Sequence, residues 1–234
     1  CYTCLMQDSV SFSLTFLKKE QVNYDTWTFY FQKSQGFRYQ AGQYIKIKLP
    51  IDHPDNRGVS RYFTLSSSPT EEYLTITTRI IKSTFKNTLN SLEKGQMVEA
   101  RGPWGDFVLN ENGKETRVFL AGGIGLTPFR SMLKYIADMK MDIPVVMFNS
   151  YKTEKDAEIS SVLEPFQKEL PNFSLKIIHE RITTELLQKE LDLNSLNIYY
   201  IAGPEKMVST LALSLRKIGV LEESIKIDDF PGYT

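Results

Sequence analysis

The residues best suited to chemistry in this 234-residue chain form one glycine-rich turn, Ala121-Gly122-Gly123-Ile124-Gly125-Leu126-Thr127-Pro128. An apolar run precedes the turn and a helical pattern follows it. Glycine lets a backbone turn tightly and approach a ligand closely, while Thr127 is a suitable N-cap and Pro128 suits a first helical turn. The free N–H groups at such a helix start favour a phosphate. We therefore predict phosphate binding here, with simple packing of the turn as the alternative.

A second turn of the same kind is Ala202-Gly203-Pro204, which again stands between an apolar run and a helical pattern. In a doubly wound sheet, the loops that follow the strands lie at one edge, where ligands bind. Two glycine turns at that edge favour a dinucleotide, although an ordinary turn into a helix is the alternative for this one alone.

A third segment, Arg61-Tyr62-Phe63-Thr64, combines a cation, two aromatic rings and a hydroxyl. Arginine can hold a pyrophosphate through paired hydrogen bonds, an aromatic ring can stack on a flat ring system, and threonine can hydrogen-bond a ring heteroatom. The segment therefore suits a flat ring with a phosphate tail. Aromatic residues of a strand core are the alternative.

A fourth segment runs from Ser83 to Leu89 and contains Thr84, Lys86, Asn87 and Thr88. Hydroxyls and a lysine at a helix start again suit a phosphate. A capped amphipathic helix without a ligand is the alternative.

The elements that carry these segments differ between the two halves of the chain. Alternating or β-rich runs predict strands in the first half, and Phe85, Leu89 and Leu92 predict one helical insert over 83–94. Short strands separated by turn residues indicate an antiparallel barrel or sandwich. The predicted strands are 11–17, 26–31, 44–49, 74–81 and 98–101.

After the polar turn at 110–114, apolar strands alternate with helices, which indicates a parallel sheet covered on both faces. We therefore predict two domains, residues 1–112 and 113–234. The second domain has predicted strands at 118–121, 145–148, 175–178, 198–201 and 225–227, and predicted helices at 127–139, 159–170, 184–191 and 204–218.

Composition excludes several classes of protein. The 28 basic and 28 acidic residues give zero net charge, which argues against nucleic acid as a partner. No apolar run is long enough to span a membrane and no signal peptide is visible, so we expect a cytoplasmic protein or a soluble, cytoplasm-facing module of a larger one.

The two cysteines, Cys1 and Cys4, form a C-x-x-C pair at the start of the chain. Such a pair is redox-active or metal-binding in other settings, but a structural zinc site needs four ligands. His53 and His179 are the only histidines and lie far from the pair in sequence. We therefore expect no metal site and interpret the pair as part of a terminus or of a longer parent protein, since the chain does not begin with methionine.

The order of the motifs resembles the ferredoxin–NADP reductase family. The set is Arg-x-aromatic-Thr from Arg61, Gly-Pro-x-Gly-x-Phe over 102–107, the glycine turn, Gly-Pro from Gly203, and a terminal Phe-Pro-Gly-Tyr. The resemblance covers the chain from about Ser11. It implies an N-terminal six-stranded antiparallel β-barrel that binds FAD, and a C-terminal, Rossmann-like α/β domain that binds NAD(P).

In the barrel, the resemblance implies that Arg61 contacts the FAD pyrophosphate. Phe63 stands where the family usually has a tyrosine stacked on the flavin, and Thr64 stands within reach of flavin N5. The remaining implied contacts to FAD are Tyr62, Thr78, Arg79, Ile80, Ser83, Lys86, Asn87 and Thr88.

In the second domain, Ala202 replaces a cysteine that the family places beside the carbon that transfers hydride. Asp228 matches a carboxylate that supports proton movement, and Phe230 or Tyr233 is expected to cover the flavin until nicotinamide displaces it. The implied nucleotide contacts are Gly122, Gly123, Gly125, Thr127, Pro128, Gly203 and Pro204.

The choice between NADPH and NADH depends on the segment after the second strand of this domain. Ser150 and Lys152 suit a 2′-phosphate, and Arg181 is a further candidate. Glu154 and Asp156 would repel that phosphate or, alternatively, hydrogen-bond the ribose of NADH. We expect NADPH, with NADH as the alternative.

The resemblance implies an enzyme that takes hydride from NAD(P)H onto FAD and passes single electrons to a separate carrier, ferredoxin or flavodoxin first. The alternatives are a flavin subunit that only relays electrons, and a reductase module excised from a fusion with a haem or membrane domain.

Overall fold

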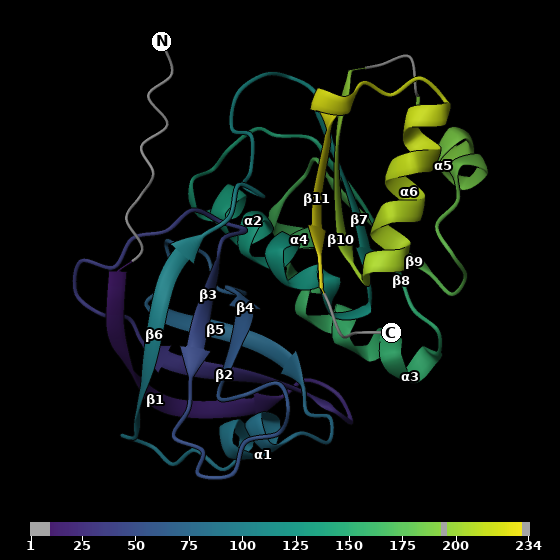
Figure 1. Ribbon diagram of the computed structural model, residues 1–234. Coiled ribbons are helices and arrows are strands. Elements are labelled where there is room, and N and C mark those ends of the chain that lie inside the picture. Colours follow the sequence, from purple (N-terminus) through teal and green to yellow (C-terminus); the bar gives the residue numbers. More distant parts are fainter. Residues whose placement is uncertain (1–9, 193–195, 231–234) are drawn as a thin grey trace.

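The computed structural model describes residues 10–192 and 196–230, which form two sheets with separate cores (Figure 1). The first sheet has six antiparallel strands in the order β4-β3-β6-β1-β2-β5. An isolated bridge between Leu65 and Ile76 joins its two ends, so the sheet curls into the predicted barrel. The strands are β1 (Val10–Gln21), β2 (Thr26–Gln32), β3 (Tyr44–Lys48), β4 (Ser60–Thr64), β5 (Tyr73–Arg79) and β6 (Met97–Trp104).

Alternation along the strands builds the barrel core. Leu14 and Phe16 of β1 and Phe29 and Phe31 of β2 are buried, because every second side chain of a strand faces the same side. Helix α1 (Thr84–Asn90) packs Phe85 and Leu89 against this core. The predicted helical insert is therefore confirmed, although it ends earlier than expected.

The second sheet has five parallel strands in the order β11-β10-β7-β8-β9, with helices on both faces (Figure 1). The strands are β7 (Thr116–Gly122), β8 (Val145–Ser150), β9 (Phe173–Ile178), β10 (Asn197–Gly203) and β11 (Ile225–Asp229). The longer helices are α2 (Thr127–Asp138) and α6 (Glu205–Lys217), and the shorter elements are η1 (Gly123–Leu126), α3 (Glu154–Ala157), η2 (Glu158–Val162), α4 (Glu164–Glu169), α5 (Thr184–Glu190) and η3 (Glu222–Ser224).

The predicted helix over 159–170 was wrong in its bounds. Thr153 caps a new helix at 154, because its side chain accepts a hydrogen bond from the N–H of Asp156. The chain then continues as 3-10 turns through η2 and restarts as α4, with Pro165 in its first turn, where a missing N–H costs nothing.

The connection between the sheets spans 105–115 and is tied to the second one. The guanidinium of buried Arg117 donates to the carbonyls of Asn110 at 2.8 Å and Asn112 at 2.6 Å, and the Tyr200 hydroxyl accepts from the N–H of Asn110 at 2.7 Å. The predicted division at 112/113 falls inside this connection and remains a prediction. No helix in the described part of the chain is long and apolar enough to cross a bilayer.

On one side of the boundary, which we call the α2 side, Ala41 of the barrel and Phe107 and Leu109 of the connection enter the core of the second domain. Ala41, Phe107 and Leu109 belong to the same buried cluster as Phe129 and Tyr200, and the Phe107 ring centroid lies 5.9 Å from that of Phe129 and 5.6 Å from that of Tyr200. We call these five residues the apolar seam.

Polar contacts reinforce the α2 side. Arg130 pairs with Glu71 through both carboxylate oxygens, one at 2.8 Å, and donates to the Ser66 carbonyl at 3.0 Å.

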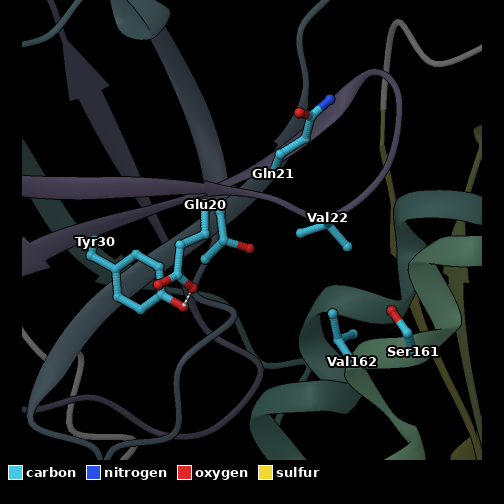
Figure 2. Close-up of a pocket in the computed structure, with 7 residues that line it drawn as sticks. Glu20, Gln21, Val22, Tyr30, Ser161 and Val162 are labelled. Atoms are coloured by element: carbon cyan, nitrogen blue, oxygen red, sulfur yellow. Dashed lines mark hydrogen bonds between the residues drawn. The ribbon is translucent and has the colours of Figure 1, made fainter.

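On the other side, which we call the α3 side, the domains leave a hollow of about 250 Å³, which polar side chains line together with Val22 and Val162, two residues that pack against the core of the second domain. Figure 2 shows Glu20, Gln21, Val22 and Tyr30 of the barrel facing Ser161 and Val162 of η2 across this hollow.

Candidate functional site

Strand β4 exposes one set of predicted residues and buries the other. Tyr62 is 61% exposed, and Thr64, two residues on, shares its face of the strand. Phe63 is only 7% exposed and faces the barrel core, where its ring centroid lies 5.9 Å from that of Phe85. Tyr62 is therefore the exposed ring of this strand, and the contact of Phe63 with a flavin remains a prediction.

Two further aromatic residues extend the exposed surface around Tyr62. The ring centroids of Tyr44 and Trp104 lie 5.7 Å and 6.2 Å from that of Tyr62. Neither residue was predicted to have a role, although Trp104 stands within the Gly-Pro-x-Gly-x-Phe motif. The pairing of β3 with both β4 and β6, which brings the three rings together, is not visible in any local pattern.

Three cations gather at the other end of β4. The Arg61 guanidinium lies 5.0 Å above the Phe85 ring and 3.0 Å from the Asp55 carboxylate, while the Lys86 ammonium lies 4.7 Å from the Phe63 ring. Burial, aided by the charges of Arg61 and Arg57, lowers the pKa of Lys86 to about 7. An anion held between these side chains would relieve their repulsion. Arg57 carried no motif and was missed in the sequence.

The other predicted FAD contacts are spread around this cation cluster. Ser83 caps α1 by accepting from the N–H of Lys86 at 3.1 Å, and buried Thr78 accepts from the Lys86 ammonium. Asn87 is exposed, whereas the Thr88 hydroxyl donates to the Thr84 carbonyl within its own helix.

Arg79 and Ile80 lie where β5 leaves the barrel. Arg79 donates to Asp25 at 2.7 Å and also reaches the second domain, and the N–H of Ile80 donates to the Asp25 carbonyl at 2.7 Å.

In the glycine turn, the three glycines have different physical roles. A side chain at Gly125 would place its Cβ 2.2 Å from the Ala202 carbonyl oxygen, and one at Gly122 would meet Met207 at 2.5 Å. Gly123 adopts a φ of +54° with nothing within 4 Å of its Cβ position. Two glycines therefore allow the two turns to pack together, and Gly123 is the one that leaves the backbone open to a ligand.

The expected N-cap at Thr127 was wrong. The turn continues as the 3-10 helix η1, so Leu126 precedes α2 and Thr127 is already helical, with a buried side chain that caps nothing. Pro128 does stand in the first turn of α2, as predicted.

The three residues predicted for catalysis meet at the domain boundary. Ala202 is fully buried on β10, where its Cα partner on the neighbouring strand β11 is Asp228. The Thr64 hydroxyl lies near the Asp228 carboxylate on the barrel side and lowers its pKa. A residue of β4 and a residue of β11 are thus neighbours at the boundary between the two domains.

The Asp228 carboxylate is electrostatically unusual. Burial raises its pKa to about 7, and the nearby charges of Asp229 and Asp106 add to this, while the Thr64 hydroxyl opposes it. Its Oδ2 atom is buried and has no hydrogen-bond partner among the described residues. A carboxyl group that titrates near neutral pH can hold or release a proton under physiological conditions.

The remaining predicted residues lie along the carboxyl edge of the parallel sheet. Ser150 is the Cα partner of Gly122, and Lys152 and Arg181 are exposed in the loops that follow β8 and β9. The N–H of Phe230 donates to the Gly203 carbonyl at 2.9 Å, which holds the chain end against the second turn. Gly203 and Pro204 connect β10 to α6, whereas Tyr233, Cys1 and Cys4 lie outside the described residues.

These features fit the two expected groups. The cluster of Arg57, Arg61 and Lys86 suits a pyrophosphate, the exposed Tyr62 and Thr64 suit a flat ring, and the open backbone at Gly123 suits a second nucleotide. Within residues 10–192 and 196–230, no group of three His, Cys, Asp or Glu side chains is arranged to hold a metal ion.

Sequence profiles of two families match the chain in the order of its sheets. The oxidoreductase FAD-binding domain matches residues 13–109, and the oxidoreductase NAD-binding domain matches residues 119–212. The two profiles together cover most of both sheets.

Individual relatives agree with the profiles. A glycine betaine monooxygenase reductase subunit from Pseudomonas aeruginosa is 34% identical over 171 residues, which are 70% of this chain and 46% of that protein. A flavohemoprotein from Bacillus subtilis is 26% identical over 91% of this chain and 57% of its own length. The chain therefore spans about half the length of these relatives.

Solved structures share the fold. A cytochrome P450 reductase from Amycolatopsis has a TM-score of 0.81 at 18% identity, over 95% of this chain and 70% of that one. A ferredoxin–NADP⁺ reductase from Plasmodium falciparum has a TM-score of 0.79 at 17% identity, over 94% of this chain and 96% of that one. The chain belongs to the ferredoxin–NADP reductase-like flavoproteins, oxidoreductases that join an FAD-binding barrel to an NAD(P)-binding domain.

Proposed function

We propose that this chain takes hydride from NAD(P)H onto FAD at the domain boundary and passes the electrons one at a time to a separate partner. The observation that carries this proposal is the buried Oδ2 of Asp228, which is unpartnered among the described residues and lies beside Ala202 of β10 and near Thr64 of the predicted flavin strand. FAD, when bound, supplies the ability to accept two electrons together and to release them singly.

The chain's own residues have three roles in this proposal. Arg61, Arg57 and Lys86 hold the pyrophosphate, and an aromatic ring of β4 lies against the flavin: Phe63, as the family resemblance implies, or the more exposed Tyr62. The glycine turn accepts the nicotinamide nucleotide, with NADPH preferred because Ser150 and Lys152 adjoin it.

Thr64 orients the ring edge, and Asp228 holds or releases a proton beside it. In this proposal, the other predicted site residues hold the side chains that contact FAD and the nicotinamide nucleotide in place.

For the acceptor we propose a one-electron carrier of the ferredoxin or flavodoxin class. A haem partner is the second candidate, because relatives named flavohemoproteins match 91% of this chain over only 57% of their own length. The two candidates differ in the partner and share the chemistry of this chain.

Anaerobic titration of the FAD-loaded protein tests the proposal. Stoichiometric NADPH is expected to bleach the flavin absorbance, and NADH is expected to do so less effectively. A flavin that neither nucleotide bleaches would overturn the enzyme and favour a subunit that only relays electrons.

A measurement of flavin retention tests separately whether Arg61 binds the FAD pyrophosphate. Arg61→Ala removes a charge-assisted contact worth about 1.5–3 kcal/mol, so it should lower FAD content after gel filtration. Arg101→Ala is a matched control on the exposed part of β6. Equal flavin content in the two variants would refute the role of Arg61.

A further inference from the structure

The outward face of the barrel carries two cations side by side, next to the predicted flavin strand. Lys46 of β3 is the Cα partner of Arg101 of β6 on one side and of Tyr62 of β4 on the other. Their chain neighbours Ile47 and Ala100 are buried, so the alternation along each strand turns both cations outward. The two cations therefore lie in one row that runs across β4, β3 and β6 (Figure 1).

This row has a cost for the folded barrel. Like charges at directly opposite positions of two strands are destabilising. Glu99, two residues before Arg101 on the same face, already pairs with Lys48 at 2.7 Å. Among the described residues, neither Lys46 nor Arg101 forms an ion pair. Two uncompensated positive charges on an exposed sheet face indicate a role in binding, since they do not help the barrel to fold.

Two partly exposed rings lie one register step from the row. Tyr44 is the Cα partner of both Thr64 and Trp104, and the ring centroids of Tyr44 and Trp104 are 6.1 Å apart. Strand geometry places the backbone of Lys46 about 8 Å and that of Arg101 about 12 Å from the backbone of Thr64. We call Tyr44, Lys46, Arg101 and Trp104 the cationic face.

The acidic groups near the cationic face are grouped at its boundary end. Burial raises the pKa of Tyr44, and Tyr62, Asp228 and Asp106 add to this. Asp106 also acts on Asp228, where the barrel meets the second domain. The face therefore has a negative edge at the boundary and a positive row beyond it.

We propose that the cationic face is the docking surface for the electron acceptor, and that the acceptor is a small carrier protein with a negatively charged surface around its redox centre. This inference rests on the proposed function, in which electrons leave for a separate partner. Two carriers dock in turn, and each takes one of the two electrons that the hydride brought, while the proton of that hydride is left to the solvent.

The two kinds of residue have different tasks in this contact. Lys46 and Arg101 attract the acidic surface of the carrier and fix its orientation. The rings of Tyr44 and Trp104 exclude water from the centre of the contact, where aromatic residues contribute most to affinity. The register of β3 and β4 keeps the docked carrier close to Thr64 and the domain boundary.

Reoxidation of the FAD-loaded chain, reduced beforehand with dithionite, tests the inference without NADPH. Ferricyanide, a trianion, and hexaammineruthenium(III), a trication, are the small one-electron probes. Lys46→Glu/Arg101→Glu should slow reoxidation by ferricyanide at least about tenfold at low ionic strength and accelerate reoxidation by the ruthenium complex. Its FAD content should not change, because neither side chain is a predicted FAD contact.

A matched control changes the net charge equally at a distance from the face. Lys168→Glu/Lys217→Glu alters two exposed helix positions of the second domain and should change either rate by less than about twofold.

A ferredoxin of net negative charge is the protein probe. Its Kd for the FAD-loaded chain, measured by calorimetry, should rise at least about tenfold in the charge-reversal variant and about fivefold in Trp104→Ala. Ferricyanide should reoxidise Trp104→Ala at the original rate, because a small ion does not need the ring.

The inference is overturned by equal ferricyanide rates in the charge-reversal and control variants, or by ferredoxin binding that none of these substitutions weakens. Tighter binding of cytochrome c, a basic haem protein, than of the ferredoxin would also overturn it. Should the charge-reversal variant not fold, Lys46→Gln/Arg101→Gln gives a second test, with the same directions and changes of about threefold. A flavin that NADPH does not bleach would refute the proposed function, whereas dithionite still reduces that flavin, so the docking surface is judged separately.

Discussion

The two sides of the domain boundary are held by different forces. On the α2 side, Phe107 and Leu109 enter the core of the second domain, and Arg130 forms an ion pair with Glu71. On the α3 side, Tyr24 and Arg79 of the barrel contact Asp156 of the second domain through exposed or half-buried polar groups beside an open hollow. Apolar burial is roughly proportional to area and insensitive to charge, whereas exposed polar pairs add little stability. The α2 side is therefore expected to contribute more to the stability of the boundary than the α3 side.

The largest expected effect tests whether the apolar seam is the main attachment. Phe107→Ala should lower the free energy of unfolding by about 3–4 kcal/mol, because it removes a buried ring that contacts both Phe129 and Tyr200. Urea denaturation measures the loss. Met97→Ala, at a side chain 69% exposed, serves as the control and should change little. A loss below about 1 kcal/mol at Phe107 would mean that the seam does not dominate.

The middle of the boundary should respond to pH through Asp228. Its pKa of about 7 means that the folded chain keeps a proton that the unfolded chain loses above about pH 4. This contribution to stability is complete below pH 4 and is lost as the pH rises through 7.

Asp228→Asn removes this titration, so its stability relative to the unsubstituted protein should rise by about 2–4 kcal/mol between pH 4 and 8. Chemical denaturation at several pH values measures the difference. The exposed carboxylate variant Glu180→Gln is the control. A pH-independent difference would show that folding does not raise the pKa of Asp228.

The ion pair on the α2 side should contribute less than the seam. Arg130→Ala should cost about 1 kcal/mol, because both partners keep about a quarter of their side-chain surface exposed. Arg216→Ala breaks a similar two-oxygen pair with Glu222 on an open surface and should show no measurable loss. Thermal or urea unfolding measures both variants. If Arg130→Ala and Arg216→Ala lower the free energy of unfolding equally, burial at the boundary adds no stability to the Arg130–Glu71 ion pair.

The smallest effect on stability is expected on the α3 side. Tyr24→Phe should change the free energy of unfolding by less than about 0.5 kcal/mol, because the two hydrogen bonds that it removes, to Asp156 and from Arg79, are both exposed. Urea denaturation under the conditions used for Phe107→Ala gives a direct comparison. A loss of stability as large as that of Phe107→Ala would contradict the conclusion that the α2 side stabilises the boundary more than the α3 side.

The sequence was informative about the fold because periodicity is local. Alternation predicted the barrel strands, and apolar runs between helical patterns predicted the parallel sheet. The ends of helices were harder to predict where a capping residue sets them. Thr153 is an example, because it starts α3 earlier than the apolar spacing indicates. Thr127 failed as a cap because the preceding turn continues as a 3-10 helix.

The candidate site was predictable only in part, since it is assembled across strands and domains. The sequence indicated Thr64 and Asp228 through the resemblance, and the structure brings them together. It could not show that Phe63 faces the core while Tyr62 is exposed, because the side of a strand depends on its register. The contact between Arg79 and Asp156 spans 77 residues of sequence and leaves no local pattern.

The most direct test of the account is the rate at which NADPH reduces the flavin in an anaerobic stopped-flow experiment. If hydride transfer occurs at the domain boundary beside Thr64 and Asp228, Thr64→Ala should slow reduction by at least about tenfold without loss of flavin. Thr210→Ala, at an exposed threonine of α6, should reduce at the original rate. An unchanged rate in the flavin-loaded Thr64→Ala protein would contradict the placement of the reaction at this boundary.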